Sequence, residues 1–221
     1  MTNVVLRIAG VAAACLIGLV AERASADVIL SVNSGSMQAG GALSLDVVVS
    51  DTSPTEGIAE MALVLEITPL TDVGDSSLNF VNPQSEAYLE EADYVFFDNS
   101  DVVLNPGDPV ATVGPFGQVV EFFDLTFDFN NELASPGKVL ATIQLEHLLG
   151  GESIANVIGD EFEIAVNTDF TEFFNAAGDP VFVDLAGTTS GMVTITAIPE
   201  PSTLGLLAIA TTGFVLRRRR H

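Results

Sequence analysis

Cysteine is nearly absent from this sequence. The only cysteine of the 221 residues, Cys15, lies in an apolar stretch near the N-terminus. If that stretch is removed as a signal, the remaining chain has no disulfide, no thiolate metal site and no cysteine nucleophile. Burial of apolar side chains must then hold the fold together, which about 170 residues can do around one core.

Basic residues are equally scarce. The chain has seven lysines and arginines against 30 acidic residues, and Lys138 is the only basic residue from Asp27 to Ile198. That span contains 28 acidic residues and so carries a formal charge of −27. Such a surface repels phosphate backbones, which excludes nucleic acid as a partner of the span. We interpret the charge as a source of solubility, with specific cation binding as the alternative.

Residue types on which enzymes often rely are also few. His147 is the only histidine besides the terminal His221, and it ends an alternating apolar run, so we expect a partly buried structural side chain. Neither Gly-x-Ser-x-Gly nor His-Glu-x-x-His occurs, which disfavours serine hydrolases and zinc peptidases. Tryptophan is absent, and Tyr88 and Tyr94 are the only tyrosines, so sugar-stacking side chains are scarce.

Carboxylates are plentiful, but no pair of them stands out as catalytic. A glycosidase needs two carboxyl groups across a cleft, usually with aromatic side chains that hold the sugar. Among 28 acidic residues some pair meets the required distance by chance, so we predict that the protein is not an enzyme. The closely spaced acidic residues are Glu90, Glu91 and Asp93, then Asp160, Glu161 and Glu163, and finally Asp124 and Asp128.

Three loops carry several oxygen donors of the kind that calcium prefers. They are residues 50–57, 97–101 and 176–180. None of them follows the Asp-x-Asp-x-Asp-Gly pattern of a calcium-binding loop. We therefore expect solvated loops and no cofactor, with a structural calcium ion as the alternative.

The N-terminus has the three parts of a secretory signal peptide. Arg7 precedes an apolar run over residues 8–21, and Ala24 and Ala26 form an A-x-A cleavage site. An uncleaved membrane anchor is the alternative, but about 20 apolar residues are needed to span a bilayer. Lipoprotein processing at Cys15 fits less well, because its apolar stretch would be unusually short. We predict a signal peptide over residues 1–26.

The middle of the chain alternates between apolar and polar residues with a period of two. This pattern is typical of half-buried β-strands. The residues that we expect to face the core are Leu43, Leu45, Val47 and Val49; Met61, Leu63, Leu65 and Ile67; Phe123, Leu125, Phe127 and Phe129; Val139, Ala141, Ile143 and Leu145; Phe162, Ile164 and Val166; and Val193, Ile195 and Ala197.

Shorter segments complete an all-β pattern. Strands are also expected to begin at Val28, Leu78, Tyr94, Val102 and Val181, and turn signals containing glycine, proline and aspartate separate them. Only residues 83–93 resemble a helix, of two turns. Nine or ten short strands with this punctuation predict a single β-sandwich of the jelly-roll type.

The segment "VNSGSMQAGGALSLDVVVSDTSPTEGIAEMALVLEI" resembles the opening of a cohesin-like domain. "GKVLATIQLEHLLGGE" and "GTTSGMVTIT" are similar to the middle and last strands of that family, which is related in fold to carbohydrate-binding modules. The resemblance implies a jelly roll of about nine strands. Ile67, Thr68 and Pro69 stand where the family usually has Tyr-Asp after its core strand, so the resemblance does not extend to dockerin binding.

The C-terminal tail, residues 198–221, has three parts. Pro199, Glu200 and Pro201 precede an apolar run over residues 204–216, which Arg217, Arg218, Arg219 and Arg220 follow. In this order the parts resemble a PEP-CTERM sorting signal, which implies that the apolar run is a short transmembrane sorting helix. The prolines force an exposed, extended segment, and the arginines hold the end of the run on the cytoplasmic side of a membrane. The resemblance implies an exosortase as processing enzyme, a transient stay in the inner membrane and a Gram-negative cell that exports polysaccharide. A plain membrane anchor is the alternative.

Together these features divide the chain into a signal peptide (1–26), a β-sandwich (27–197) and a sorting tail (198–221). We predict an exported, non-enzymatic protein of the cell surface or extracellular matrix. It is expected to associate with exopolysaccharide or another surface protein in a structural or adhesive role. The alternative is a carbohydrate-binding module that recognises extracellular polysaccharide.

Overall fold

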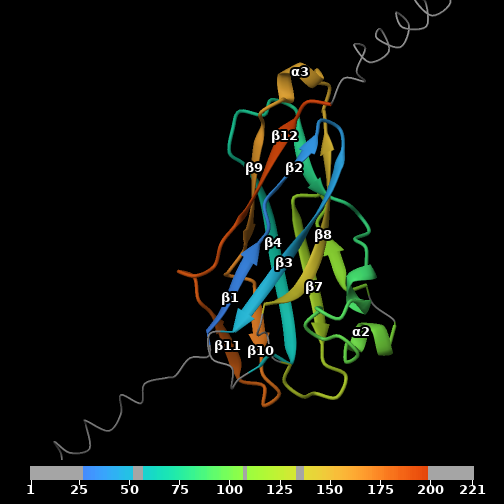
Figure 1. The fold of residues 1–221 in the computed structure, drawn as a ribbon, viewed down its shortest axis with the longest axis vertical. Coiled ribbons are helices and arrows are strands. Elements are labelled where there is room, and N and C mark those ends of the chain that lie inside the picture. Colours follow the sequence, from blue (N-terminus) through green and yellow to red (C-terminus); the bar gives the residue numbers. More distant parts are fainter. Residues whose placement is uncertain (1–26, 52–56, 107–108, 133–136, 199–221) are drawn as a thin grey trace, which may run out of the picture.

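Two β-sheets pack face to face in the computed structural model, which describes residues 27–51, 57–106, 109–132 and 137–198 (Figure 1). The single β-sandwich that the sequence predicts is therefore confirmed. The described residues form twelve strands, where the sequence predicts about nine. The additional strands are short: β2 (Gly35–Gln38), β6 (Ala111–Val113) and β10 (Glu172–Phe174).

Two long alternating segments form the centre of the first sheet. Its order is β1 (Asp27–Val32), β3 (Ala42–Asp51), β8 (Lys138–Leu148) and β5 (Ser77–Phe80), and all three pairs are antiparallel. The pairing of β3 with β8 shifts register between Val47 and Val48, at an irregularity typical of a β-bulge.

The second sheet is arranged around β4 (Glu60–Pro69). On one side β4 pairs with β7 (Val119–Leu125), which pairs with β6. On its other side β4 pairs with β10 near its start and with β9 (Glu161–Val166) near its end. β12 (Gly191–Thr196) continues the sheet from β9, and β2 is the edge strand.

β11 (Pro180–Val183) joins the two sheets. Its first half pairs with β10 through Pro180 and Val181, and its second half pairs with β1 through Phe182 and Val183. β11 therefore crosses from one sheet to the other at an open edge of the sandwich. This crossing creates the groove described below.

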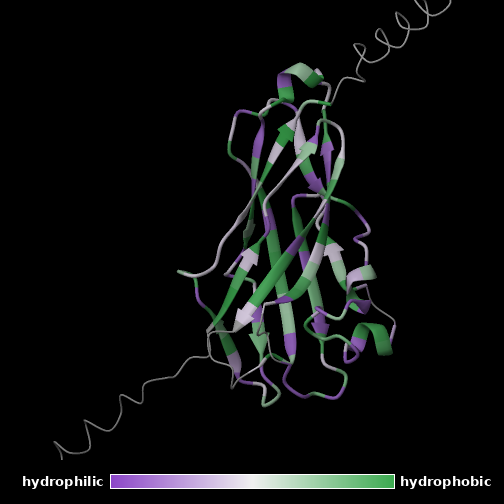
Figure 2. Cartoon of the chain, in the orientation of Figure 1, coloured by the Kyte–Doolittle hydropathy of each residue, from purple (hydrophilic) through white to green (hydrophobic). Residues whose placement is uncertain are grey.

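The core lies between the sheets, and most of the predicted inward residues form it. Met61, Leu63, Leu65 and Ile67 of β4 are at most 5% exposed, and Ile143 and Leu145 of β8 are fully buried. Figure 2 shows hydrophobic residues concentrated along the strands and polar residues in many of the connecting loops. The alternation in β3, β4, β8, β9 and β12 is confirmed, except at Ala197, which follows β12 and is exposed.

The predicted facing of β7 is wrong. Phe122 and Asp124 point into the core and are fully buried, whereas Phe123 is 43% exposed. The strand begins at Val119 and ends at Leu125, and Phe127 and Phe129 lie beyond it, 46% and 69% exposed. The reversal is explained by hydrogen bonds that satisfy the Asp124 carboxylate inside the protein, because a buried carboxylate without partners would be costly.

Two predicted strands are also wrong, and the predicted helix is shorter than expected. Tyr94 lies in a turn and makes only an isolated bridge to Val139. The strand expected at Val102 is the helical turn α2 (Asp101–Leu104), because the side chain of Ser100 caps it by accepting a hydrogen bond from the Val103 amide. Residues 83–93 contain only the 3₁₀ turn η1 (Ala87–Glu90). One further helical turn, α3 (Ile154–Val157), precedes β9.

Candidate functional site

The predicted processing residues lie outside the part of the chain that the structure describes. This applies to Ala24 and Ala26 at the N-terminus and to Pro199, Glu200, Pro201 and Arg217, Arg218, Arg219 and Arg220 at the C-terminus. The described chain begins in β1 and ends at Ile198, two residues after β12. These two ends lie at opposite poles of the sandwich (Figure 1).

Phenylalanines gather on the outer face of the second sheet, across β7, β4 and β10. The register places Phe123 and Glu172 on either side of Ala62, and Leu125 and Phe174 on either side of Glu60. Antiparallel partners point to the same face of a sheet. The exposed face therefore carries aromatic rings and carboxylates together.

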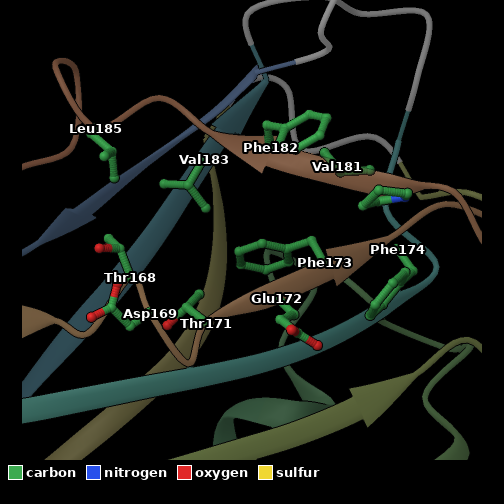
Figure 3. Close-up of a pocket in the computed structure, with 11 residues that line it drawn as sticks. Thr168, Asp169, Thr171, Glu172, Phe173, Phe174, Val181, Phe182, Val183 and Leu185 are labelled. Carbon is green, nitrogen blue, oxygen red and sulfur yellow. The ribbon is translucent and has the colours of Figure 1, made fainter.

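A groove of about 440 Å³ opens where β11 leaves β10 to join β1. We call it the β11 groove. Figure 3 shows Val183 and Leu185 on one side of the opening and Thr168, Asp169 and Thr171 on the other. Its remaining lining residues are Glu172, Phe173, Phe174, Pro180, Val181 and Phe182.

The chain around β10 explains why the β11 groove exists. The segment between β9 and β10 leaves the sheet as a turn. Val64 of β4 is paired with neither β9 nor β10, and its amide donates instead to the Thr171 hydroxyl, at 3.0 Å. Phe173 and Val181 form an apolar floor, at 1% and 5% exposure, and Leu185 stands 64% exposed at the mouth. Apolar walls with exposed carboxylates suit a partner that has apolar groups and either positive charge or hydroxyl donors.

A buried polar cluster surrounds Asp124. Its Oδ2 atom accepts hydrogen bonds from Tyr94 Oη and Ser100 Oγ, both at 2.6 Å, and its Oδ1 atom accepts the Leu125 amide at 2.8 Å and the Val102 amide at 3.4 Å. Burial raises the pKa of Asp124, and these hydrogen bonds offset part of the rise.

The tyrosines of this cluster are core residues. Burial and the Asp124 charge raise the pKa of Tyr94 well above its ordinary value. Tyr88 packs edge-on against Tyr94, with ring centroids 5.4 Å apart, and its Oη has no hydrogen-bond partner among the described residues. Because both rings are at most 3% exposed, neither can stack on a sugar at the surface. The cluster therefore orders the segment from Tyr94 to α2 against β7.

His147 is more deeply buried than the sequence predicts, at 2% exposure. Its Nδ1 atom accepts the Gly40 amide proton at 3.0 Å, so the neutral ring carries its proton on Nε2. Nε2 has no partner among the described residues. Burial lowers the pKa of His147, and the Asp160 carboxylate offsets part of the effect. With no nucleophile bonded to the ring, the geometry is that of a structural histidine.

The other predicted carboxylates are dispersed. Asp128 accepts hydrogen bonds from Asn99 and Asn130, which lower its pKa. Asp160, directly before β9, accepts a hydrogen bond of 2.9 Å from Ser76 Oγ. Among the described residues, no group of three or more His, Cys, Asp or Glu side chains is arranged to hold a metal ion. Of the three loops weighed for calcium, residues 52–56 lie outside the described chain.

The β11 groove and the exposed Phe123 were not predicted from the sequence. The groove depends on the crossing of β11 between sheets, which is a feature of topology. Phe123 had a detectable signal, because Val120 and Phe122 form a second alternation in the opposite phase. Asp124 belongs to that second alternation, and a carboxylate argues against an inward face unless its hydrogen-bond donors are known.

Residues 197–220 match the family model described as the PEP-CTERM protein-sorting motif. This confirms the predicted tail, with a start one residue earlier than expected. The motif marks the chain as an exported protein that is sorted by an exosortase. Among the residues that the structure describes, no helix is long and apolar enough to cross a membrane.

Solved cohesin structures match the fold of the whole sandwich. A type I cohesin, OlpC from Clostridium thermocellum, solved in a cohesin–dockerin complex, has a TM-score of 0.50 at 14% identity, covering 80% of this chain and 99% of its own. The third cohesin of ScaC from Acetivibrio cellulolyticus has a TM-score of 0.48 at 15% identity, with 77% and 99% covered. A non-cellulosomal cohesin from Archaeoglobus fulgidus has a TM-score of 0.46 at 10% identity, with 79% and 95% covered. No curated protein matches the sequence.

Proposed function

We propose that this protein is delivered through its sorting tail to the cell surface or extracellular matrix, where it has a structural or adhesive role in association with exopolysaccharide. The observation that carries this proposal is the sorting motif at residues 197–220. It follows an acidic sandwich in which the described residues contain no arrangement of side chains typical of an active site. In this proposal the protein is the substrate of a processing enzyme and catalyses no reaction.

Each terminal segment has a role in this proposal. Signal peptidase cleaves after Ala26, and β1 begins at the next residue. Pro199, Glu200 and Pro201 form an extended segment that an exosortase can reach, since prolines pair poorly in a sheet. Arg217, Arg218, Arg219 and Arg220 stop transfer at the cytoplasmic face until the tail is processed.

The fold supports a binding or structural role for the sandwich. The cohesin of Clostridium thermocellum with the same fold was solved bound to a dockerin. At 14% identity the likeness covers the fold alone, so we extend to this chain only the general role of an exported domain that holds a partner.

Mass spectrometry of the mature C-terminus, on protein from its native cell, tests the proposal. We expect the chain to end near Pro199–Pro201. An intact sequence through His221 in the surface fraction would refute processing. A variant with Glu200→Ala and Pro201→Ala should retain its tail and accumulate at the inner membrane, whereas Glu161→Ala, inside the sandwich, should be processed normally.

A second candidate function is recognition of the polysaccharide itself. The observation that favours it is the placement of Phe123, Glu172, Glu60 and Phe174 on one exposed sheet face, because aromatic faces and carboxylates are common in sugar-binding sites. A glycan-binding screen of residues 27–197 tests it. Phe116, in the turn between β6 and β7, is 84% exposed and serves as the control. Loss of binding in Phe123→Ala, but not in Phe116→Ala, would support this role, and absence of binding to any glycan would leave the scaffold role.

A further inference from the structure

One pole of the sandwich exposes a group of aliphatic side chains. We call it the α3 pole. Each of these side chains is between 41% and 51% exposed: Leu70, Leu148, Ile154, Ile158 and Ile198. The exposed large side chains elsewhere in the described chain are mostly phenylalanines, and all three exposed isoleucines belong to this pole.

Hydrogen bonds from several strands bring these residues to the same end. The Leu70 amide donates to the carbonyl of Glu161 at the start of β9, and the Gly159 amide donates to the carbonyl of Ile195 near the end of β12. Leu148 ends β8, beside the turn at Gly40 and Gly41 that contacts His147. Figure 1 shows α3 and the end of β12 together at this pole, and β10 and β11 at the opposite one.

The sorting tail leaves the sandwich from the α3 pole. The last sheet-like hydrogen bond of β12 runs from the Ala39 amide to the Thr196 carbonyl, at 3.2 Å. Only residues 197 and 198 separate Thr196 from Pro199. Seven residues, 197–203, separate Thr196 from the apolar run that begins at Leu204. Because an extended residue spans at most about 3.5 Å, a membrane that holds this run comes within about 28 Å of the α3 pole.

The charges of the α3 pole restrict which lipid surface it can face. Asp72, Asp75 and Glu152 lie there, and the one lysine of the described chain is at the start of β8, where its ammonium donates to the Ala92 carbonyl. Acidic residues without basic neighbours are repelled by anionic lipid headgroups. Aliphatic side chains, in contrast, are stabilised when they enter the interface of a bilayer.

We propose that the α3 pole rests on a zwitterionic bilayer surface while the tail is membrane-bound. This inference depends on the proposed sorting function, since the tail is what brings the pole to the membrane. The contact needs little affinity of its own, because a tether of seven residues, 197–203, gives a high effective concentration of the pole at the bilayer. The contact orients the domain with the β11 groove away from the membrane.

The absence of tryptophan allows a clean fluorescence test. Full-length protein carrying I158W, or separately I154W, is reconstituted into phosphatidylcholine vesicles with and without brominated acyl chains. F182W, at the opposite pole with 47% exposure, is the matched control. We expect brominated lipid to quench I158W and I154W and to blue-shift their emission, while F182W is unchanged. Thermal melts in the absence of vesicles confirm that each variant folds.

The outcomes separate this inference from the proposed function. If the protein floats with the vesicles but neither pole tryptophan is quenched more than F182W, the tail is inserted and the pole contact is refuted. If the protein does not float, tail insertion fails and the contact fails with it. Equal or stronger quenching in vesicles rich in phosphatidylglycerol would contradict the charge argument and overturn the choice of a zwitterionic surface.

Discussion

Tyr94 donates a hydrogen bond of 2.6 Å from its Oη atom to Oδ2 of Asp124, in a part of the core where both side chains are fully buried. Tyr88 packs against the same ring, but its own Oη has no partner among the described residues. The two tyrosines therefore differ in hydrogen bonding while being alike in burial.

This difference predicts opposite results for two conservative substitutions. Tyr94→Phe removes a hydrogen bond to a carboxylate and should lower the free energy of unfolding by about 2 kcal/mol. Tyr88→Phe removes a hydroxyl without a partner and should leave stability unchanged or raise it slightly. Urea denaturation of both variants makes the comparison. Equal losses would contradict the hydrogen-bond assignment.

The raised pKa of Asp124 predicts a specific dependence of stability on pH. Between the ordinary carboxyl pKa of about 3.8 and the raised folded value, the folded state holds a proton that the unfolded state has released. Stability contributed by this group is therefore present at low pH and is lost as the pH rises through that interval, by at most about 1.4 kcal/mol per pH unit.

Asp124→Asn tests this dependence, because an amide has the same shape and does not titrate. As the pH rises through the interval, the unfolding free energy of the wild type should fall relative to that of the variant. Asp128→Asn, at an exposed carboxylate with a lowered pKa, is the control and should not show this trend. A pH-independent difference for Asp124→Asn would contradict the assigned shift.

Neighbouring phenylalanines of β7 test its facing directly. Phe122 is fully buried and Phe123 is 43% exposed. Phe122→Ala should destabilise the protein by about 3–5 kcal/mol through the loss of core contacts, whereas Phe123→Ala should change stability by about 0.5 kcal/mol or less. Chemical denaturation measures both. A larger loss for Phe123→Ala would restore the facing predicted from the sequence.

The strands β4 and β7 differ in how well their alternation predicts which side chains are buried. Met61, Leu63 and Leu65 of β4 belong to an apolar alternation that continues to Ile67, whereas the opposite phase is interrupted by Glu66, so their burial could be predicted. Residues 119–129 contain two alternations, and the one with four apolar residues appears stronger because the other includes Asp124. The donors that make burial of Asp124 acceptable, Tyr94 and Ser100, are more than 20 residues away in sequence and only the fold brings them there.

The parts of the site differ in the same way. The sorting tail could be predicted because its residues act in sequence order, from prolines through an apolar run to arginines. The β11 groove could not be predicted, because it forms where β11 stops pairing with β10 and begins to pair with β1. Local alternation does not encode pairings between distant strands. Likewise, the α3 pole joins Leu70 and Ile158 through the pairing of β4 with β9, and Leu148 reaches it on β8 of the other sheet.

The turn at Gly150 and Gly151 offers a test of local packing at the α3 pole. Both residues have positive φ, at 61° and 104°. A Cβ on Gly150 would collide with the carbonyl oxygen of Asp75, whereas a Cβ on Gly151 would meet nothing within 4 Å. Gly151→Ala should therefore cost only the backbone strain of about 1–2 kcal/mol, and Gly150→Ala should cost clearly more. Equal shifts in thermal midpoint would contradict the close approach.

His147 predicts a pH dependence with the opposite sign to that of Asp124. Burial lowers its folded pKa, so between the ordinary value of 6.5 and the lower folded value the unfolded state binds a proton that the folded state does not. Stability contributed by His147 is thus complete above about pH 6.5 and is lost as the pH falls through that interval. Protonation would also remove the Nδ1 lone pair that accepts the Gly40 amide.

His147→Asn separates the charge from the hydrogen bond, since its Oδ1 can accept the Gly40 amide in place of Nδ1. As the pH falls below 6.5, the wild type should lose at most about 1.4 kcal/mol of stability per pH unit through His147. We expect the variant to lack this loss. Unfolding followed by circular dichroism from pH 7.5 to 5 measures both proteins, and Asp124→Asn, which keeps His147, should retain the acid-side loss. Parallel profiles for wild type and His147→Asn would show that His147 does not titrate between its folded and unfolded states in this range.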